Sequence, residues 1–147
     1  MSTRSLIGRE CADGHVVGIY CHFDGYPDGV GATLLAHWTD PGKVDDLLAL
    51  GDLSVLGEVL GEKHPFDTFL YTEEEKARFA GWTLAYGRDR GEEGTAAQTF
   101  PDAESFAASN SWALFSYLFR DGVWLYRSRR SLADFAPVAD ALTASAA

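Results

Sequence analysis

The sequence has little basic charge and no long apolar run. Lys and Arg number 12 against 22 Asp and Glu, which gives a formal net charge of −10. Because so acidic a chain repels nucleic-acid phosphates and anionic lipid, we expect no direct binding to nucleic acid. No apolar run approaches the roughly 20 residues that cross a bilayer, and the first ten residues, MSTRSLIGRE, lack a hydrophobic signal core. These features predict a cytoplasmic protein without membrane contact.

Cysteine is also scarce. Cys11 and Cys21 are the only two, and neither stands at a zinc-binding spacing from the histidines. Without a secretory signal, a reducing compartment favours two free thiols. We therefore expect neither a disulfide nor a cofactor.

Apolar residues, by contrast, are plentiful. They make up 46% of 147 residues and include 9 Phe, 6 Tyr and 4 Trp, enough for one packed core. We expect a single domain over residues 1–147, with residues 144–147 as a disordered tail that has nothing to bury.

Two pairs of strand-like segments are each joined by an Asp-Gly dipeptide, the strongest short signal for a hairpin. Residues 82–87, WTLAYG, predict a further lone strand, and residues 88–100 a polar loop. The hairpin segments are residues 4–11 with 16–23, and residues 111–120 with 123–130.

Helix start signals lie between these strands. Asp40 is a candidate N-cap, followed by Pro41 and by apolar residues at helical spacing up to Gly51. Residues 53–61 read as a turn or short helix. The whole pattern predicts an α+β fold: a mostly antiparallel sheet, built from two hairpins and a lone strand, with helices packed on it. Two further helix starts are Thr72, which forms a capping box with Glu75, and Asp102.

Ionisable groups concentrate in YCHFDGYPDGVG, residues 20–31, directly after the second predicted strand. Strand alternation places Tyr20 and His22 on the face away from the core. If the following loop stays extended, Asp24, Tyr26 and Asp28 continue along the same side. The opposite, core-facing set is Val17, Ile19, Cys21 and Phe23.

Three interpretations of this loop compete. A nucleotide triphosphatase loop needs a Lys and a Ser or Thr that the segment lacks. His22, Asp24 and Asp28 are acceptable ligands for a divalent metal, but this spacing also occurs in many loops by chance. In the third, Asp and Gly simply form a turn in which Asp24 caps backbone amides.

A second polar cluster, YGRDRGEE, covers residues 86–93. Arg88 and Arg90 carry planar donors suited to phosphate or carboxylate, unless they pair with Asp89, Glu92 or Glu93 in a solvated loop. If the lone strand lies beside the second strand, these arginines meet His22 and Asp24 in one anion pocket.

A third cluster, WLYRSRR, covers residues 124–130. Alternation puts Trp124 and Tyr126 on one face and Arg127 and Arg129 on the other. We expect a structural role, with the aromatic rings in the core, and we find no Ser, His and acid combination to assign to catalysis.

Four motifs occur in order: MSTRSLIG, IYCHFDGYPDGVGATLL, KVDDLLALGDLSVLGE and AYGRDRGE. They resemble a group of small proteins common in bacteriophage genomes and mobile elements, over about two thirds of the chain. Relatives more often carry Trp at position 23 and His at position 87, where this chain has Phe23 and Gly87. The resemblance implies a role in phage and host conflict or in small-molecule handling during infection, and supplies no catalytic residues.

Three hypotheses follow from the sequence. The first is a non-catalytic protein that holds an anionic small molecule, such as a nucleotide derivative, between the two polar loops. The second is an acidic inhibitor of a host or defence protein, and the third is a metal-dependent hydrolase that uses His22 with Asp24. The ligand-binding residues of the first are Tyr20, His22, Asp24, Tyr26, Asp28, Arg88, Arg90 and Glu92.

Overall fold

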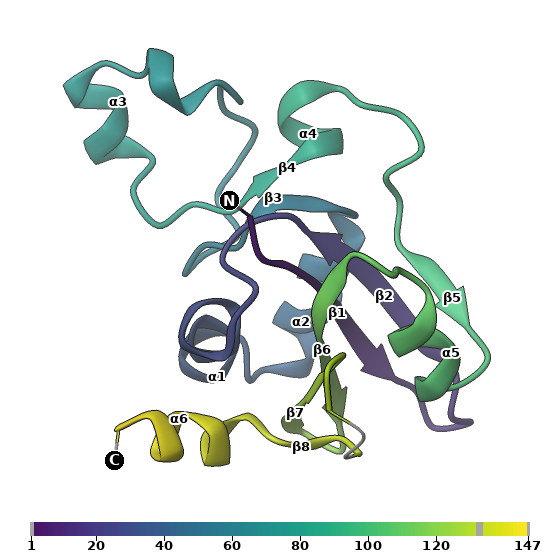
Figure 1. Cartoon of the computed structure of the whole chain (residues 1–147). Helices are drawn as coiled ribbons and strands as arrows, with labels where there is room; N and C mark the ends of the chain where they lie inside the picture. Colours follow the sequence, from purple (N-terminus) through teal and green to yellow (C-terminus); the bar gives the residue numbers. More distant parts are fainter. Residues whose placement is uncertain (1, 132–133, 147) are drawn as a thin grey trace.

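The computed structural model describes residues 2–131 and 134–146. Within these residues one mixed sheet of eight strands runs in the order β4-β3-β2-β1-β6-β7-β8, and β5 also pairs with β2 (Figure 1). The strands are β1 (Arg4–Glu10), β2 (Val16–Cys21), β3 (Leu53–Val55), β4 (Leu84–Ala85), β5 (Gln98–Phe100), β6 (Ala113–Arg120), β7 (Val123–Ser128) and β8 (Ala136–Pro137). The helices are α1 (Ala32–His37), α2 (Pro41–Ala49), α3 (Glu73–Arg78), α4 (Tyr86–Arg90), α5 (Ala103–Ala108) and α6 (Val138–Ala146).

Both predicted hairpins are confirmed. β1 pairs antiparallel with β2, and β6 pairs antiparallel with β7. At the second turn Asp121 and Gly122 have φ values of 51° and 79°, the left-handed geometry that matches the twist of the strands. The two hairpins join through a parallel pairing of β1 with β6, which makes the sheet mixed although most of its pairs are antiparallel.

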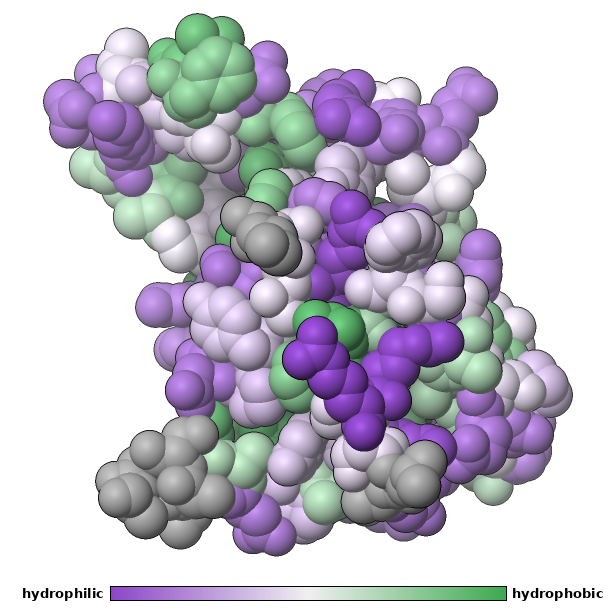
Figure 2. Space-filling view, in the orientation of Figure 1, coloured by the Kyte–Doolittle hydropathy of each residue, from purple (hydrophilic) through white to green (hydrophobic). Residues whose placement is uncertain are grey.

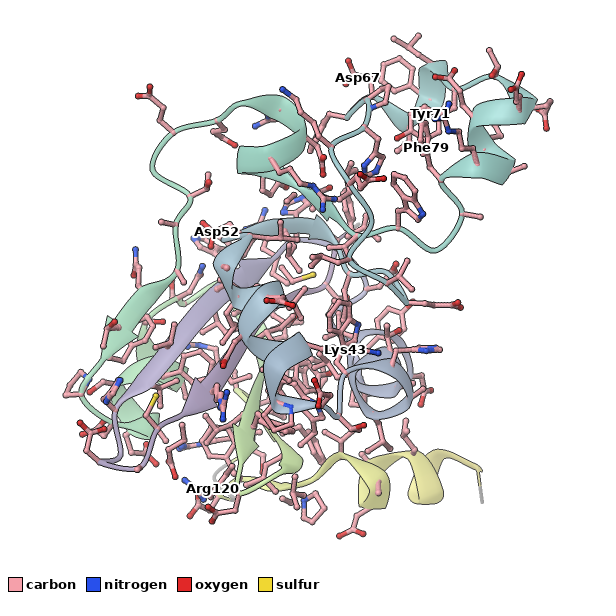
Figure 3. The ribbon with its side chains drawn as sticks, turned by 180° about the vertical axis from the view of Figure 1, so that it is seen from behind. Lys43, Asp52, Asp67, Tyr71, Phe79 and Arg120 are labelled. Carbon is pink, nitrogen blue, oxygen red and sulfur yellow. The ribbon has the colours of Figure 1, made fainter. Side chains whose placement is uncertain are left out.

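The sheet buries side chains on both faces. The larger cluster lies on the face covered by α2, and Val17, Ile19 and Cys21 contribute to it as expected. The smaller cluster lies under α5 and is centred on Phe106. Figures 1 and 3 show the two helices on opposite sides of the sheet. Phe23 is 42% exposed, contrary to the expected core position, because β2 ends at Cys21 and Phe23 belongs to the following loop.

Two paired glycines make room for α5. Gly8 of β1 lies opposite Gly18 of β2, and the Phe106 ring covers both. A Cβ atom added at Gly18 would lie 2.6 Å from Phe106 Cε1, closer than carbon atoms approach. The absence of two side chains therefore seats this helix on the sheet.

The predicted helix starts are confirmed. Asp40 accepts a hydrogen bond from the Lys43 N–H, and Pro41 occupies the first turn of α2. Thr72 and Glu75 form the expected capping box of α3. The carboxylate of Asp102 accepts from the Ser105 N–H at 2.8 Å and caps α5.

The predictions for residues 53–61 and 82–100 were partly wrong. Strand β4 contains only Leu84 and Ala85, and Tyr86 begins α4. The reason lies in Asp89, whose carboxylate accepts from the Ala85 N–H at 2.8 Å and closes a helical turn that Gly91 ends with φ of 71°. The polar loop also contains β5, and residues 53–55 form β3 because they pair with β2 and β4.

At the C-terminus, α6 begins directly after Pro137 and continues to Ala146. It therefore includes residues 144–146 of the expected tail, while residue 147 lies outside the described part. No helix in residues 2–131 and 134–146 is long and apolar enough to span a bilayer. Both thiols are free, and burial raises the pKa of Cys21 to about 12.

Candidate functional site

The glycine-rich loop folds back on β1 and does not stay extended. Asp24 adopts a left-handed conformation with φ of 58°, and its carbonyl accepts from the Val30 N–H at 2.8 Å. The buried Tyr117 hydroxyl donates to the Gly25 carbonyl at 2.6 Å. Tyr26 donates to Asp24 Oδ1 at 3.1 Å, and Asp28 is exposed in the helical turn of residues 27–31. The loop is therefore a turn held by internal bonds, in which the Asp24 carboxylate accepts from the Tyr26 hydroxyl instead of capping backbone amides as expected.

Tyr20 and His22 lie on one side of the sheet, as alternation predicts. The Tyr20 hydroxyl and His22 Nδ1 are hydrogen-bonded at 2.7 Å. Burial, together with the positive charge of Arg4, lowers the pKa of His22. His22 is therefore a neutral, oriented imidazole at neutral pH rather than a cation that attracts phosphate.

Arg88 forms hydrogen bonds to groups inside the protein. Its guanidinium donates to the carbonyls of Leu60 and Thr83 at 2.9 Å and 2.7 Å, and to both carboxylate oxygens of Asp89. The Asp89 side chain is fully buried and also accepts from the His64 N–H at 3.2 Å. These bonds fix the segment before Thr83 against α4, and they occupy the donors that an anion would need.

Arg90 and Glu92 lie at the surface. Arg90 donates to Glu92 Oε2 at 2.9 Å, and its guanidinium stacks against the rings of Phe66 and Tyr86 at 4.8 Å and 4.9 Å. The charges of this pair are therefore mutually neutralised.

The two predicted loops do not form one pocket. The reason is strand order: β3 lies between β2 and β4, so β4 is two strands from β2, about 10 Å away. In the part of the chain that the structure describes, no hydrogen bond or ion pair joins Arg88 or Arg90 to residues 22–28. Among the expected ligand-binding residues, Tyr20 lines a cleft that also contains an arginine, Arg4.

That cleft has a volume of about 330 Å³ and lies on the α5 face of the sheet. Trp112, which is 71% exposed, stands at its rim, and the Arg4 guanidinium stacks on the indole at 5.5 Å. Arg4 makes no side-chain hydrogen bond or ion pair with any other described residue. The guanidinium N–H groups of such an arginine are free to bind an anion, and the neighbouring indole can stack on a ring. The pair therefore suits a ligand that carries an anionic group on an aromatic ring.

Polar groups line the cleft beside the apolar side chains of Leu6, Phe100 and Phe106. Asp52 Oδ1 accepts from the Tyr20 N–H at 3.0 Å, and burial raises the pKa of this carboxyl group. Burial also raises the pKa of Tyr20, which keeps its hydroxyl protonated. Gln98 and Asn110 line the same cleft, and Asn110 Oδ1 accepts from the Trp112 N–H at 2.9 Å. Donors and acceptors of this kind orient a flat, polar ligand.

Sequence reasoning missed most of this cleft. Arg4, Asp52, Gln98 and Trp112 come from four distant segments, and only the sheet pairing brings them together. Trp112 carried a usable signal, because it precedes a strand and lies outside its apolar alternation. Asp52 directly follows Gly51, where the sequence predicts the end of a helix, and no local pattern distinguishes it.

The described residues contain no cluster of three or more His, Cys, Asp and Glu side chains placed to hold a metal ion. His22 bonds to Tyr20 and Asp24 bonds to Tyr26, so the two proposed ligands face different partners.

A larger depression of about 620 Å³ lies between α2 and the ends of the hairpins. Its charged groups are mostly bound to one another: Arg9 pairs with Asp45 at 2.6 Å, and Glu10 binds Arg120 through two bonds of 2.9 Å. It therefore offers fewer free polar groups than the Arg4–Trp112 cleft.

Comparisons with protein-family models, with curated proteins and with solved structures found no match.

Proposed function

We propose that this protein binds an anionic small molecule with a flat aromatic ring, of which a mononucleotide is the simplest class, and that it does so without catalysis. The observation that carries the proposal is Arg4, whose guanidinium stacks on exposed Trp112 and has no other described side-chain partner. The proposal keeps the ligand class expected from the sequence and moves the site to the Arg4–Trp112 cleft.

Each group in the cleft has a defined role in this proposal. Arg4 binds the phosphate, and Trp112 presents a face for the base. Asp52 and Gln98 supply an acceptor and an amide for the polar edge of the base. The Tyr20 N–H bonds to Asp52, and the neutral His22 imidazole fixes the Tyr20 hydroxyl.

The experiment is a titration of the protein with AMP, GMP, CMP and UMP. Binding is monitored by tryptophan fluorescence and by two-dimensional NMR. Trp112 is the most exposed of the four tryptophans, so stacking there quenches its emission. We expect Arg4→Gln and Trp112→Ala each to weaken the best ligand about tenfold or more, because each removes an interaction of roughly 1–3 kcal/mol.

The matched control is Arg78→Gln, which removes the same charge from α3, remote from the cleft. Binding in this control must equal that of the parent protein. If no mononucleotide binds at millimolar concentration, or if Arg4→Gln and Arg78→Gln behave alike, the proposed site is wrong.

A second candidate function rests on the lobe of residues 61–82. This lobe stands away from the sheet, and Asp67, Tyr71 and Phe79 lie together in it, remote from Asp52 (Figure 3). Phe69 and Leu70 of this lobe are 82% and 69% exposed. Figure 2 shows a strongly hydrophobic patch at the tip of the lobe. Exposed carboxylates lie near this tip in the sequence: Asp67, Glu73 and Glu74.

We propose that the lobe docks into an apolar socket bordered by basic side chains on a host or defence protein. Protein interfaces typically combine buried apolar anchor residues with surrounding charges that are opposite in sign to the charges on the partner. The test is a pull-down from host lysate with the parent protein and with Phe69→Ser/Leu70→Ser. A partner that is retained by the parent, lost by the double variant and released by salt supports the proposal. Equal recovery by both proteins contradicts it.

A further inference from the structure

A smaller pocket, separate from the Arg4–Trp112 cleft, lies on the other side of α5. It has a volume of about 160 Å³ and lies over β6 and β7. Figure 2 shows strongly hydrophilic side chains gathered over β6, β7 and α5. The lining includes Arg127, Arg129, Ser116, Ser128 and Glu104.

Two arginines converge there because of strand alternation. Arg127 lies in β7, and Arg129 directly follows the last residue of this strand. Because the two are two residues apart, they project from the same face. Arg127 donates one terminal N–H to Glu104 at 2.8 Å. Arg129 donates from one nitrogen to the Asn110 carbonyl at 3.3 Å, and its backbone N–H binds the Leu114 carbonyl at 2.8 Å. Both guanidinium groups are thereby held in place with further donors available.

Ser116 supplies an independent observation. It lies opposite Arg127 in the β6–β7 register, it is 5% exposed, and it lines the pocket. Its hydroxyl has no hydrogen-bond partner among residues 2–131 and 134–146. A hydroxyl that lines a pocket and has no bond to another described side chain is available to donate to a polar occupant.

The charge of the pocket selects an anion. Arg127 and Arg129 contribute two positive charges against the single carboxylate of Glu104, in a chain whose net charge is −10. Guanidinium forks and serine hydroxyls are the side chains that bind tetrahedral oxyanions.

We propose that this pocket binds a phosphate group, held by Arg127, Arg129 and the Ser116 hydroxyl. The group is either inorganic phosphate or the phosphoryl end of a small phosphomonoester. The inference does not depend on the proposed nucleotide cleft, because the two pockets share no lining residue.

The experiment follows the backbone amides of Ser116, Ser128 and Arg129 by NMR during titration with sodium phosphate, and with O-phosphoserine in parallel. Sodium chloride at equal ionic strength corrects for screening. We expect saturable shifts at these amides with phosphate and none with chloride. Tighter binding of phosphoserine identifies a monoester as the ligand, and tighter binding of phosphate identifies the free ion.

Arg129→Gln is the main variant, because this side chain is exposed and its loss does not disturb the core. We expect it to weaken phosphate about tenfold, and Ser116→Ala to weaken it severalfold. Arg78→Gln, with the same charge change elsewhere, and Arg4→Gln, in the other cleft, should leave phosphate binding unchanged. Shifts that do not saturate, an unchanged affinity in Arg129→Gln, or a loss of binding in Arg4→Gln would each overturn the proposal. Failure of nucleotide binding with intact phosphate binding would affect the proposed function alone.

Discussion

Gly18 has no room for a side chain, since its neighbour on the α5 face is the ring of Phe106. An added Cβ atom would lie 2.6 Å from Phe106 Cε1 and 3.3 Å from Phe100 Cε2. Phe106 is fully buried, so its ring cannot swing into solvent. The contact explains why a glycine interrupts an otherwise apolar strand.

We predict that Gly18→Ala lowers the free energy of unfolding by about 1–3 kcal/mol, the usual cost of overpacking a core. Urea denaturation measures this change. The control is the same substitution in a Phe106→Leu background, where the smaller side chain makes room and the added cost of the alanine should shrink. An equal cost in both backgrounds would show that Phe106 is not the obstacle.

Asp52 gives a pH-dependent prediction. Because burial raises its pKa in the folded protein, ionisation of Asp52 opposes folding. The stability linked to this group is present below the ordinary pKa of 3.8 and is lost as pH rises through the higher folded value. Asn at this position keeps an acceptor for the Tyr20 N–H but carries no charge.

We therefore expect Asp52→Asn to be more stable than the parent protein at pH 7, with a difference that shrinks as pH falls towards 3.8. Denaturation curves recorded at several pH values give this comparison. A variant that is less stable at pH 7 would mean that the ionised carboxylate makes a stabilising contact.

At the level of elements, the lobe of residues 61–82 depends on α4. Arg88 bonds to the carbonyls of Leu60 and Thr83, at the two ends of the lobe, and neutralises buried Asp89. Helix α3 has no buried residue of its own. The lobe is consequently held mainly by its base, through His64, Arg88 and Asp89.

We predict that Arg88→Met costs about 3–5 kcal/mol, because it leaves the Asp89 carboxylate buried without its partner. Arg90→Met is the matched control, since its ion pair with Glu92 is exposed and is worth about 1 kcal/mol or less. Hydrogen exchange should show faster opening of residues 61–82 in the first variant only. Equal effects of the two substitutions would contradict the structural role assigned to Arg88.

At the level of the whole molecule, the excess of carboxylates opposes compaction. The net charge is −10 and the isoelectric point is about 4.6. Self-repulsion of this kind is weakened by salt, because the Debye length falls from roughly 30 Å at about 10 mM to roughly 8 Å at about 150 mM.

We expect the free energy of unfolding at pH 7 to rise over this range of sodium chloride concentration. The same titration near pH 4.6, where the net charge is close to zero, should show little or no rise. Stability that falls with salt at pH 7 would indicate that attractive ion pairs outweigh the net repulsion.

The sequence by itself determined the local structure. Asp-Gly dipeptides fixed both hairpins, and Asp40, Thr72 and Asp102 fixed the helix starts, because turn and cap geometry depends on residues within a few positions of one another. Alternation in β2 likewise placed Tyr20 and His22 on one face. The α+β class and the mostly antiparallel sheet followed from these elements.

Only the tertiary structure decided how the elements are ordered across the sheet. The insertion of β3 between β2 and β4 separated His22 from Arg88, and the parallel pairing of β1 with β6 brought Arg4 to Trp112. Neither pairing is encoded within one segment, because pairing of distant strands depends on the burial of both sheet faces at once. The packing of distant segments also directs Arg88 inward. There it bonds to buried Asp89 and to the carbonyls of Leu60 and Thr83, which no local sequence pattern indicates.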